Sequence, residues 1–245
     1  MSQNVSKKKV IIIGASSGIG KCLAKVFSEH GYAVGITARR LELLSEAAKE
    51  CPSDVFIKQM DVSNPVEAMG ILEEIIKEMG GVDTVVINAG VGFDNQDLIW
   101  EKENKTIGVN VIGFTAIANV AMKHFLKQKS GHLVGISSIA AIRGNPSAPA
   151  YNASKAFISN YLEAMRLKAI KSKIPITVTD IQPGFVGTAM AQGEGTFWVI
   201  SAKQAATQIF NAIRKKKKHA YVTRRWRIIA WLFRIMPDWI LAKIL

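Results

Sequence analysis

Short apolar runs and longer amphipathic stretches alternate along almost the whole chain. The short runs are rich in valine and isoleucine and apolar throughout, as strands are when helices cover both faces of their sheet. They predict strands at 10–13, 33–38, 54–60, 84–88, 132–137 and 176–181, with a weaker one at 220–223. The longer stretches predict helices at 18–30, 41–49, 65–79, about 97–128, 151–171 and 201–215.

This alternation predicts an α/β fold, a doubly wound parallel sheet of about seven strands with helices on both faces. No linker or repeat interrupts the pattern before a basic run near residue 214. We therefore expect one domain at 1–223 and a basic, amphipathic C-terminal segment at 224–245. Ligands of such sheets bind outside the carboxyl ends of the strands, so the residues that follow each strand are the candidates for chemistry.

A glycine-rich turn, GASSGIG at 14–20, follows the first predicted strand and leads into a helix. Gly14 permits a tight turn, and Gly18 and Gly20 let the backbone approach a pyrophosphate at the helix N-terminus. The spacing differs from the common G-x-G-x-x-G, and a purely structural turn is the alternative. Its position after the first strand favours a dinucleotide site.

The end of the second predicted strand favours one nicotinamide cofactor over the other. An NAD site has a carboxylate there for the ribose hydroxyl, whereas this chain has Arg39 and Arg40. A guanidinium matches a 2′-phosphate with paired, charge-assisted hydrogen bonds. We therefore predict NADP(H) in preference to NAD(H), with solvated arginines at a helix start as the alternative.

The motifs GASSGIG, NAG, YNASK and PGFVGT each follow a predicted strand, and their order resembles the short-chain dehydrogenase/reductase family over roughly residues 8–222. The resemblance implies hydride transfer with a nicotinamide cofactor, and implies that Asp61, with Val62 beside it, contacts the adenine. Ile13 and Ile87 depart from the family's usual threonine and asparagine, which puts loop rigidity in doubt. The residues expected to bind the cofactor are Gly14, Ser16, Ser17, Gly18, Ile19, Gly20, Arg39, Arg40, Asp61, Val62, Asn88, Ala89, Gly90, Tyr151, Lys155, Pro183, Gly184, Val186 and Thr188.

Tyr151 and Lys155 are four residues apart, so a helix would place them on one face, one turn apart. The resemblance implies that Tyr151 is the catalytic acid/base and Lys155 its partner. It also implies a hydroxyl donor at Ser138, rather than Ser137, and a fourth polar residue, Asn110, that could hold a water. We expect the Lys155 ammonium to lower the pKa of the Tyr151 phenol. For any one of these residues, an ordinary structural role is the alternative.

The composition indicates the cellular compartment of the protein. The two cysteines, Cys22 and Cys51, cannot build a disulfide framework and indicate a reducing compartment, so we expect a cytoplasmic location. The apolar run after the N-terminal lysines is too short for an export signal. The four histidines are isolated and show no ligand spacing, so no metal site is expected.

The basic charge is concentrated near the C-terminus. Residues 214–227 hold eight Lys/Arg and no acid, and without them the net charge falls from +13 to +5. Arg234, Pro237 and Asp238 exclude a spanning helix from 224–245, yet three of the five tryptophans lie there. We therefore expect a segment that lies on an anionic membrane surface, at the membrane's inner face. A subunit contact or a core cover is the alternative, and nucleic-acid binding lacks a recognition motif.

Together these features predict an NADP(H)-dependent oxidoreductase for a carbonyl or alcohol substrate, in a homo-oligomer. Residues 189–200, with Met190, Phe197 and Trp198, are expected to cover an apolar substrate pocket. A non-catalytic NADP-binding protein, either a redox sensor or a membrane-associated adaptor, is the alternative. Cofactor binding without turnover would favour it.

Overall fold

One parallel sheet organises the part of the chain that the computed structural model describes, residues 7–188 and 198–244. Its strands are β1 (Lys9–Ile13), β2 (Ala33–Ala38), β3 (Val55–Gln59), β4 (Thr84–Ile87), β5 (Gly131–Ile136), β6 (Ile176–Pro183) and β9 (His219–Val222). They lie in the order β3-β2-β1-β4-β5-β6-β9, and every neighbouring pair is parallel. The predicted fold class is confirmed, and the strand order reverses between β1 and β4.

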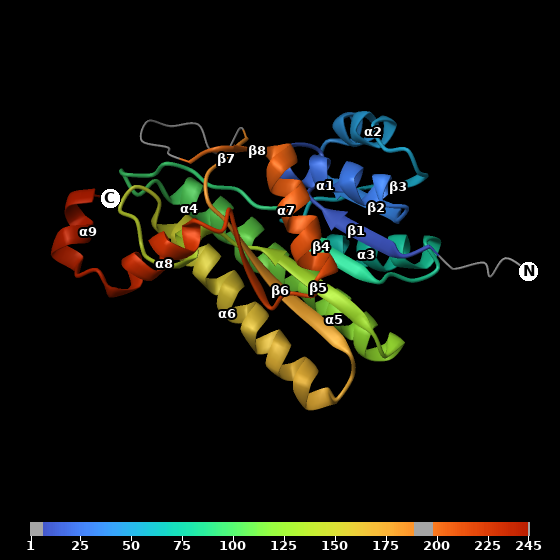
Figure 1. The fold of residues 1–245 in the computed structure, drawn as a ribbon. Helices are drawn as coiled ribbons and strands as arrows, with labels where there is room; N and C mark the ends of the chain where they lie inside the picture. Colours follow the sequence, from blue (N-terminus) through green and yellow to red (C-terminus); the bar gives the residue numbers. More distant parts are fainter. Residues whose placement is uncertain (1–6, 189–197, 245) are drawn as a thin grey trace, which may run out of the picture.

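Helices cover both faces of this sheet (Figure 1). One face carries α1 (Gly18–Glu29), α2 (Leu41–Lys49) and α7 (Ala202–Arg214), and the other carries α3 (Pro65–Glu78), α5 (Phe114–Gln128) and α6 (Pro149–Ser172). Alternate residues of β1 show why its run is apolar throughout. Val10 and Ile12 pack into the first core, whereas Ile11 and Ile13 pack into the second.

The long helix predicted at about 97–128 is three consecutive pieces. They are α4 (Trp100–Ile107), a π-helical turn η1 (Gly108–Gly113) and α5. Helix α4 begins at Trp100 because the preceding residue, Ile99, is hydrogen-bonded to the Asn95 side chain. The Asn95 amide donates to the Ile99 carbonyl, and its oxygen accepts from the Ile99 backbone N. Position 113 requires glycine because a Cβ there would lie 2.9 Å from the Cβ of Val62. Trp100–Gln128 is long and apolar enough to cross a membrane, but 61% of its most apolar window is buried in the fold.

Other boundaries differ from the predictions by one or two residues. The helix that carries Tyr151 begins at Pro149, because proline suits the first helical position, where no backbone donor is needed. β6 extends to Pro183 because β9 pairs with it as far as Pro183. Two short strands, β7 (Val186–Gly187) and β8 (Ile200–Ser201), pair outside the main sheet and were not predicted.

Two short helices follow β9 at the carboxyl edge of the sheet, α8 (Trp226–Ile235) and α9 (Asp238–Ile244) (Figure 1). The Trp226 side chain is buried, and it packs so closely on Gly184 that a Cβ at Gly184 would overlap its indole. Arg143 donates hydrogen bonds to the carbonyl oxygens of Phe233, at 2.8 Å, and Met236, at 2.7 Å. These contacts anchor the C-terminal segment, whose division from the domain at residue 223 stays a prediction.

Candidate active site

The carboxyl ends of β1 and β4 meet at the predicted glycine turn. Gly14 has φ +86°, and a Cβ there would lie 2.7 Å from the backbone nitrogen of Ala89. The Asn88 amide donates a hydrogen bond of 2.7 Å to the Gly14 carbonyl oxygen. A Cβ at Gly20 would overlap this same oxygen, so α1 also lies close against the turn. The glycines at 14 and 20 are therefore needed for close packing at the topological switch point.

The two departures from the family pattern lie beneath this turn. Ile13 and Ile87 are both buried at the ends of their strands, within the core between the sheet and α3. The turn is held instead by main-chain bonds, since the backbone N–H groups of Gly14 and Ala15 both donate to the Thr37 carbonyl, at 2.8 and 3.0 Å. Together with the Asn88 amide, these bonds supply the bracing that the departures put in doubt.

The N-terminus of α1 has the features of an anion site. The first turn of α1 contains no acidic residue, and the Ser17 side chain makes no capping hydrogen bond. Gly18 has φ +56°, and a Cβ there would lie 3.1 Å from the Thr188 side chain, so the residue at the end of the predicted closing loop reaches the turn. Ile19 packs against the first core. The backbone donors at a helix N-terminus and the positive end of the helix dipole favour a pyrophosphate.

Only one of the two arginines after β2 contacts the glycine turn. Arg40 Nη2 lies 3.2 Å from Ser16 Oγ and 3.5 Å from Ser17 Oγ, and both hydroxyls accept from it. Arg39 is exposed, and its carbonyl accepts a hydrogen bond from the Gln59 amide at 2.8 Å. The Arg40 guanidinium, beside the α1 N-terminus, fits a cofactor phosphate.

The residues predicted to contact the adenine follow β3. Asp61 Oδ1 accepts two hydrogen bonds from Ser63, from its backbone N at 3.0 Å and its Oγ at 2.7 Å. Asp61 thus closes the turn before α3. Val62 is buried and lies against Gly113 of η1.

Three of the four predicted catalytic side chains meet at the start of α6. The Tyr151 ring packs on Gly92, where a Cβ would lie 2.7 Å from ring atom Cδ2. The Ser138 side chain lies close enough to the Tyr151 phenol to lower its pKa, and Ser138 Oγ accepts from the backbone N of Ala140 at 3.1 Å. The Lys155 Nζ lies 5.7 Å from the centre of the Tyr151 ring.

Burial is the main cause of the pKa shifts of Tyr151 and Lys155. Lys155 is only 4% exposed, its Nζ donates to the Ile136 carbonyl at 3.0 Å, and desolvation lowers its pKa to about 8 despite the opposing charge of Asp180. Burial raises the pKa of the Tyr151 phenol, and the Ser138 hydrogen bond acts in the opposite direction. The prediction that Lys155 lowers the Tyr151 pKa is therefore wrong for the protein groups alone, because desolvation has the larger effect.

Asn110 is fully buried within η1, and its side chain is occupied. Its Oδ1 accepts from the Val91 backbone N at 2.8 Å, and its Nδ2 donates to the Val91 carbonyl at 2.8 Å and to Ser154 Oγ at 2.9 Å. A Cβ at Gly90 would lie 3.3 Å from both Asn110 Oδ1 and Lys155 Nζ, so the loop after β4 runs between them. Asn110 braces this loop, and both polar atoms of its side chain are already hydrogen-bonded.

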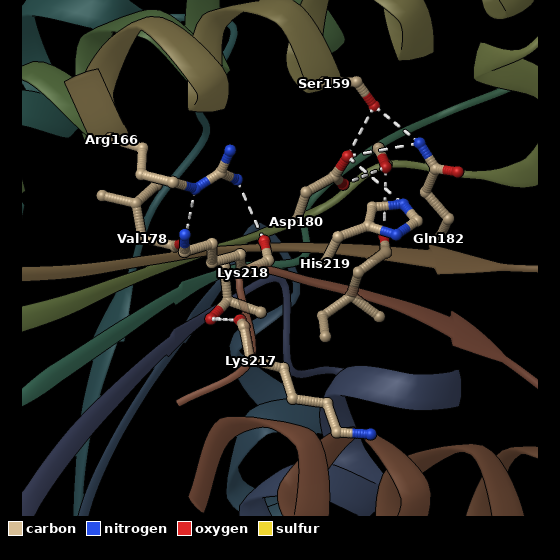
Figure 2. A network of polar contacts seen from close by, with 11 residues as sticks. Ser159, Arg166, Val178, Asp180, Gln182, Lys217, Lys218 and His219 are labelled. Carbon is tan, nitrogen blue, oxygen red and sulfur yellow. Dashed lines mark hydrogen bonds and ion pairs between the residues drawn. The ribbon is translucent and has the colours of Figure 1, made fainter. Parts of the chain in front are cut away.

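A buried polar network around Asp180 was missed by sequence reasoning (Figure 2). At its centre, Asp180 of β6 is 4% exposed. Ser137 Oγ donates to one carboxylate oxygen, and the other accepts from Ser159 Oγ at 2.8 Å and Gln182 Nε2 at 3.2 Å, with His219 Nε2 4.0 Å away. The bonds from Ser137, which follows β5, and from Ser159 of α6 tie these two parts of the chain to β6.

This network separates the roles of the two serines after β5. Ser137 is occupied by Asp180, whereas Ser138 faces Tyr151. One signal was present in the sequence, because Asp180 is the only charged residue in the predicted strand at 176–181. A charge inside a buried strand requires partners, although the pattern did not identify them.

The loop after β6 connects the site to the C-terminal segment. Pro183 ends β6, the Gly184 backbone N donates to the Val222 carbonyl at 2.7 Å, and Val186 is buried. The predicted pocket residues Met190 and Phe197 lie outside the described residues. Trp198 is described; it contacts Trp226 edge-on, with ring centres 5.8 Å apart, and so faces α8.

The residues present fit a nicotinamide dinucleotide. Side chains at Gly14 or Gly20 would fill the close approach at the turn, and a guanidinium lies beside the helix N-terminus that would receive the phosphates. The glycine turn and Lys155 are joined through the loop after β4, in which Ala89 touches Gly14 and Gly90 touches Lys155. One extended ligand can therefore contact both the turn and the catalytic group.

Known proteins resemble this chain over most of its length. An 11-beta-hydroxysteroid dehydrogenase-like 2 protein of Arabidopsis thaliana is 34% identical over 251 residues, which cover 95% of this chain and 78% of the relative. The structure of ElxO with bound NADP has a TM-score of 0.75 at 24% identity, covering 88% of this chain and 96% of ElxO. A 3-ketoacyl-(acyl-carrier-protein) reductase from Brucella melitensis in complex with NADH has a TM-score of 0.77 at 22% identity, covering 87% and 94%. Because residues 8–197 also match the short chain dehydrogenase family, this chain belongs to that family of oxidoreductases.

Proposed function

We propose that this protein is an NADP(H)-dependent oxidoreductase that interconverts a carbonyl and an alcohol on an apolar small molecule. One observation carries the proposal. A buried Lys155, a half-buried Tyr151 and the Ser138 hydroxyl converge at the carboxyl edge of the sheet, joined through Gly90 and Ala89 to a glycine turn that suits a pyrophosphate. A purely structural role for these residues would not require an ammonium to be buried beside them.

The chain's own residues have separable roles in this reaction. A bound nicotinamide would supply or accept the hydride. Tyr151 donates a proton to the carbonyl oxygen during reduction and removes it during oxidation, and Ser138 donates a hydrogen bond to the same oxygen while negative charge develops there. Lys155, whose pKa is about 8, carries a positive charge at neutral pH, with its Nζ 5.7 Å from the centre of the Tyr151 ring.

Arg40 supports the preference for NADP(H). Its guanidinium already lies within hydrogen-bond distance of two hydroxyls of the glycine turn, where a 2′-phosphate would offer it stronger, charged acceptors. An apolar substrate is supported by the Arabidopsis relative, whose name refers to a hydroxysteroid. A homo-oligomer and a cytoplasmic location stay predictions of the sequence.

The reaction is tested with Tyr151→Phe. NADPH oxidation is followed at fixed wavelength with a panel of aliphatic ketones, aldehydes and acyl-linked ketones. The variant should lose about 10²–10⁴-fold in turnover, since the phenolic proton is removed, while NADPH binding persists. Tyr161→Phe, a half-buried tyrosine on the same helix, is the matched control and should keep full activity. An undiminished rate for Tyr151→Phe would contradict the proposal, and NADPH binding without turnover of any carbonyl would favour the non-catalytic alternative.

The cofactor preference is tested by fluorescence titration with NADPH and NADH. Arg40→Ala should weaken NADPH binding about 10–100-fold, the range for hydrogen bonds to a charged group, and leave NADH binding unchanged. Arg39→Ala measures the contribution of the second predicted arginine, which is exposed as Arg40 is. Equal affinity of the unmodified protein for the two cofactors would refute the preference.

A further inference from the structure

Helix α8 has apolar side chains on two opposite sides. On the inner side, Trp226 and Ala230 are 2% and 1% exposed. On the outer side, Ile228, Trp231 and Ile235 are 63%, 60% and 61% exposed. At about 100° per residue these three fall within one narrow stripe, roughly opposite the buried pair. The α8 face consists of these three residues and Leu232.

Packing within the fold accounts for the inner side of α8 only. Trp226 fills the space above Gly184, and Arg143 holds the carbonyls at the end of the helix. The α8 face instead points away from these contacts into solvent. A second tryptophan, Trp239 of α9, is 66% exposed on the same C-terminal segment, which lies at the outer end of the molecule (Figure 1).

Exposed arginines flank the α8 face along one side. Arg227 and Arg234 are seven residues apart and so fall on the same side of the helix, next to the stripe. In residues 7–188 and 198–244, neither forms an ion pair with a carboxylate. The only acid in the C-terminal segment is Asp238, which lies 3.9 Å from Arg143.

The lysine run expected to share this surface lies elsewhere. Residues 215–218 precede β9, whereas α8 follows it, so the two basic groups lie at opposite ends of this strand. Four strand residues span about 13 Å, and β9 is parallel to its neighbours, which puts the lysines at the amino edge of the sheet. The positive charge available to the α8 face is therefore that of the arginines.

We propose that the α8 face docks on the surface of an anionic lipid bilayer. Exposed aliphatic side chains enter the boundary of the acyl region, an indole lies at the headgroup level, and arginines meet the lipid phosphates. A second copy of this chain fits less well, because a self-complementary contact would bring Arg227 and Arg234 of both copies together without acids to balance them. A helix of ten residues is about half the length needed to span a bilayer.

Docking in this way would place the candidate active site at the membrane. Trp226, on the inner side of α8, packs on the loop after β6, which borders the glycine turn through Thr188. The bilayer would thus lie against the edge of the sheet at which the cofactor and substrate are expected. This interaction goes beyond the proposed reaction and does not depend on it.

Vesicle co-sedimentation of the full chain tests the docking. Vesicles of phosphatidylcholine alone are compared with vesicles that also contain phosphatidylglycerol, at low and high salt. Only the anionic vesicles should bind strongly, and high salt should weaken the binding. Arg227→Gln with Arg234→Gln should reduce the affinity about 30-fold, and Trp231→Ser with Ile235→Ser should reduce it at least tenfold.

Matched controls change similar residues away from α8. Val66→Ser removes an apolar side chain of α3 that is 84% exposed, and Lys49→Gln with Lys77→Gln removes two exposed charges. Both should bind vesicles as the unmodified protein does, and melting curves establish that every variant is folded. Absence of binding, equal binding to neutral vesicles, or equal loss in the controls would overturn the proposal. A change of sedimentation coefficient in the α8 variants without a change in vesicle binding would also overturn it and would indicate a second copy.

Discussion

Replacing Lys155 by methionine should stabilise the folded protein although it removes the predicted catalytic ammonium. Burial lowers the pKa of Lys155 from 10.5 to about 8, so the charged form is disfavoured by folding. The difference between these values corresponds to about 3 kcal/mol at neutral pH, where both the folded and the unfolded chain are protonated. Methionine has a similar length and no charge, but it loses the hydrogen bond to the Ile136 carbonyl, which costs about 1 kcal/mol. The expected net gain is about 2 kcal/mol.

The dependence of this gain on pH distinguishes a charge effect from a packing effect. Between pH 8 and 10.5 the folded Lys155 is deprotonated while the unfolded one still binds a proton, so the unmodified protein becomes more stable as the pH rises. The advantage of Lys155→Met should therefore shrink through this range and reverse near its upper end. Urea unfolding at a series of pH values, without added cofactor, measures it. Lys168→Met, an exposed lysine on the same helix, should stay within about 0.5 kcal/mol throughout.

A Lys155→Met variant that is less stable than the unmodified protein at pH 7 would refute this reasoning. So would a gain that is the same at every pH, because it would show that shape rather than charge is responsible.

Two further predictions concern the packing on Gly184 and the hydrogen bonds of Asn110. Gly184→Ala should destabilise the protein by about 1–3 kcal/mol in urea unfolding, because its Cβ would overlap the Trp226 indole. Gly144→Ala, where a Cβ meets nothing within 4 Å, should change the stability little, and equal effects of the two would count against the contact. Asn110→Ala leaves both backbone groups of Val91 without their side-chain partner, so a loss of about 2 kcal/mol and faster hydrogen exchange at Val91 are expected. An unchanged exchange rate at Val91 would show that Asn110 does not brace the loop.

Much of the fold was predictable because its signals are local. A parallel sheet covered on both faces has continuously apolar strands, and the runs at β1 and β4 could be recognised by that feature alone. Gly14 was predictable for a related reason, since the tight turn after the first strand requires a positive φ. The weak seventh strand was also correct, although its signal was short.

Features that depend on contacts between distant residues were not predictable in this way. The π-helical turn at η1 lies against Val62, which is 51 positions from Gly113 in the chain, and the helical pattern of 97–128 gave no sign of it. The donors to Asp180 come from the residue after β5, from β6 and from α6, and the first and last converge on it only in the folded protein. The predicted direction of the Tyr151 pKa shift was wrong because the sequence shows a neighbouring charge but not the depth of burial.

The burial of Trp226 has a practical consequence for spectroscopy. Its indole is 2% exposed, whereas Trp231 and Trp239 are mostly in water. A soluble quencher such as iodide reaches the exposed rings first, so the emission that resists quenching comes largely from Trp226. Because this ring rests on Gly184, that fraction of the fluorescence provides an intrinsic optical signal from the loop after β6, with no label attached.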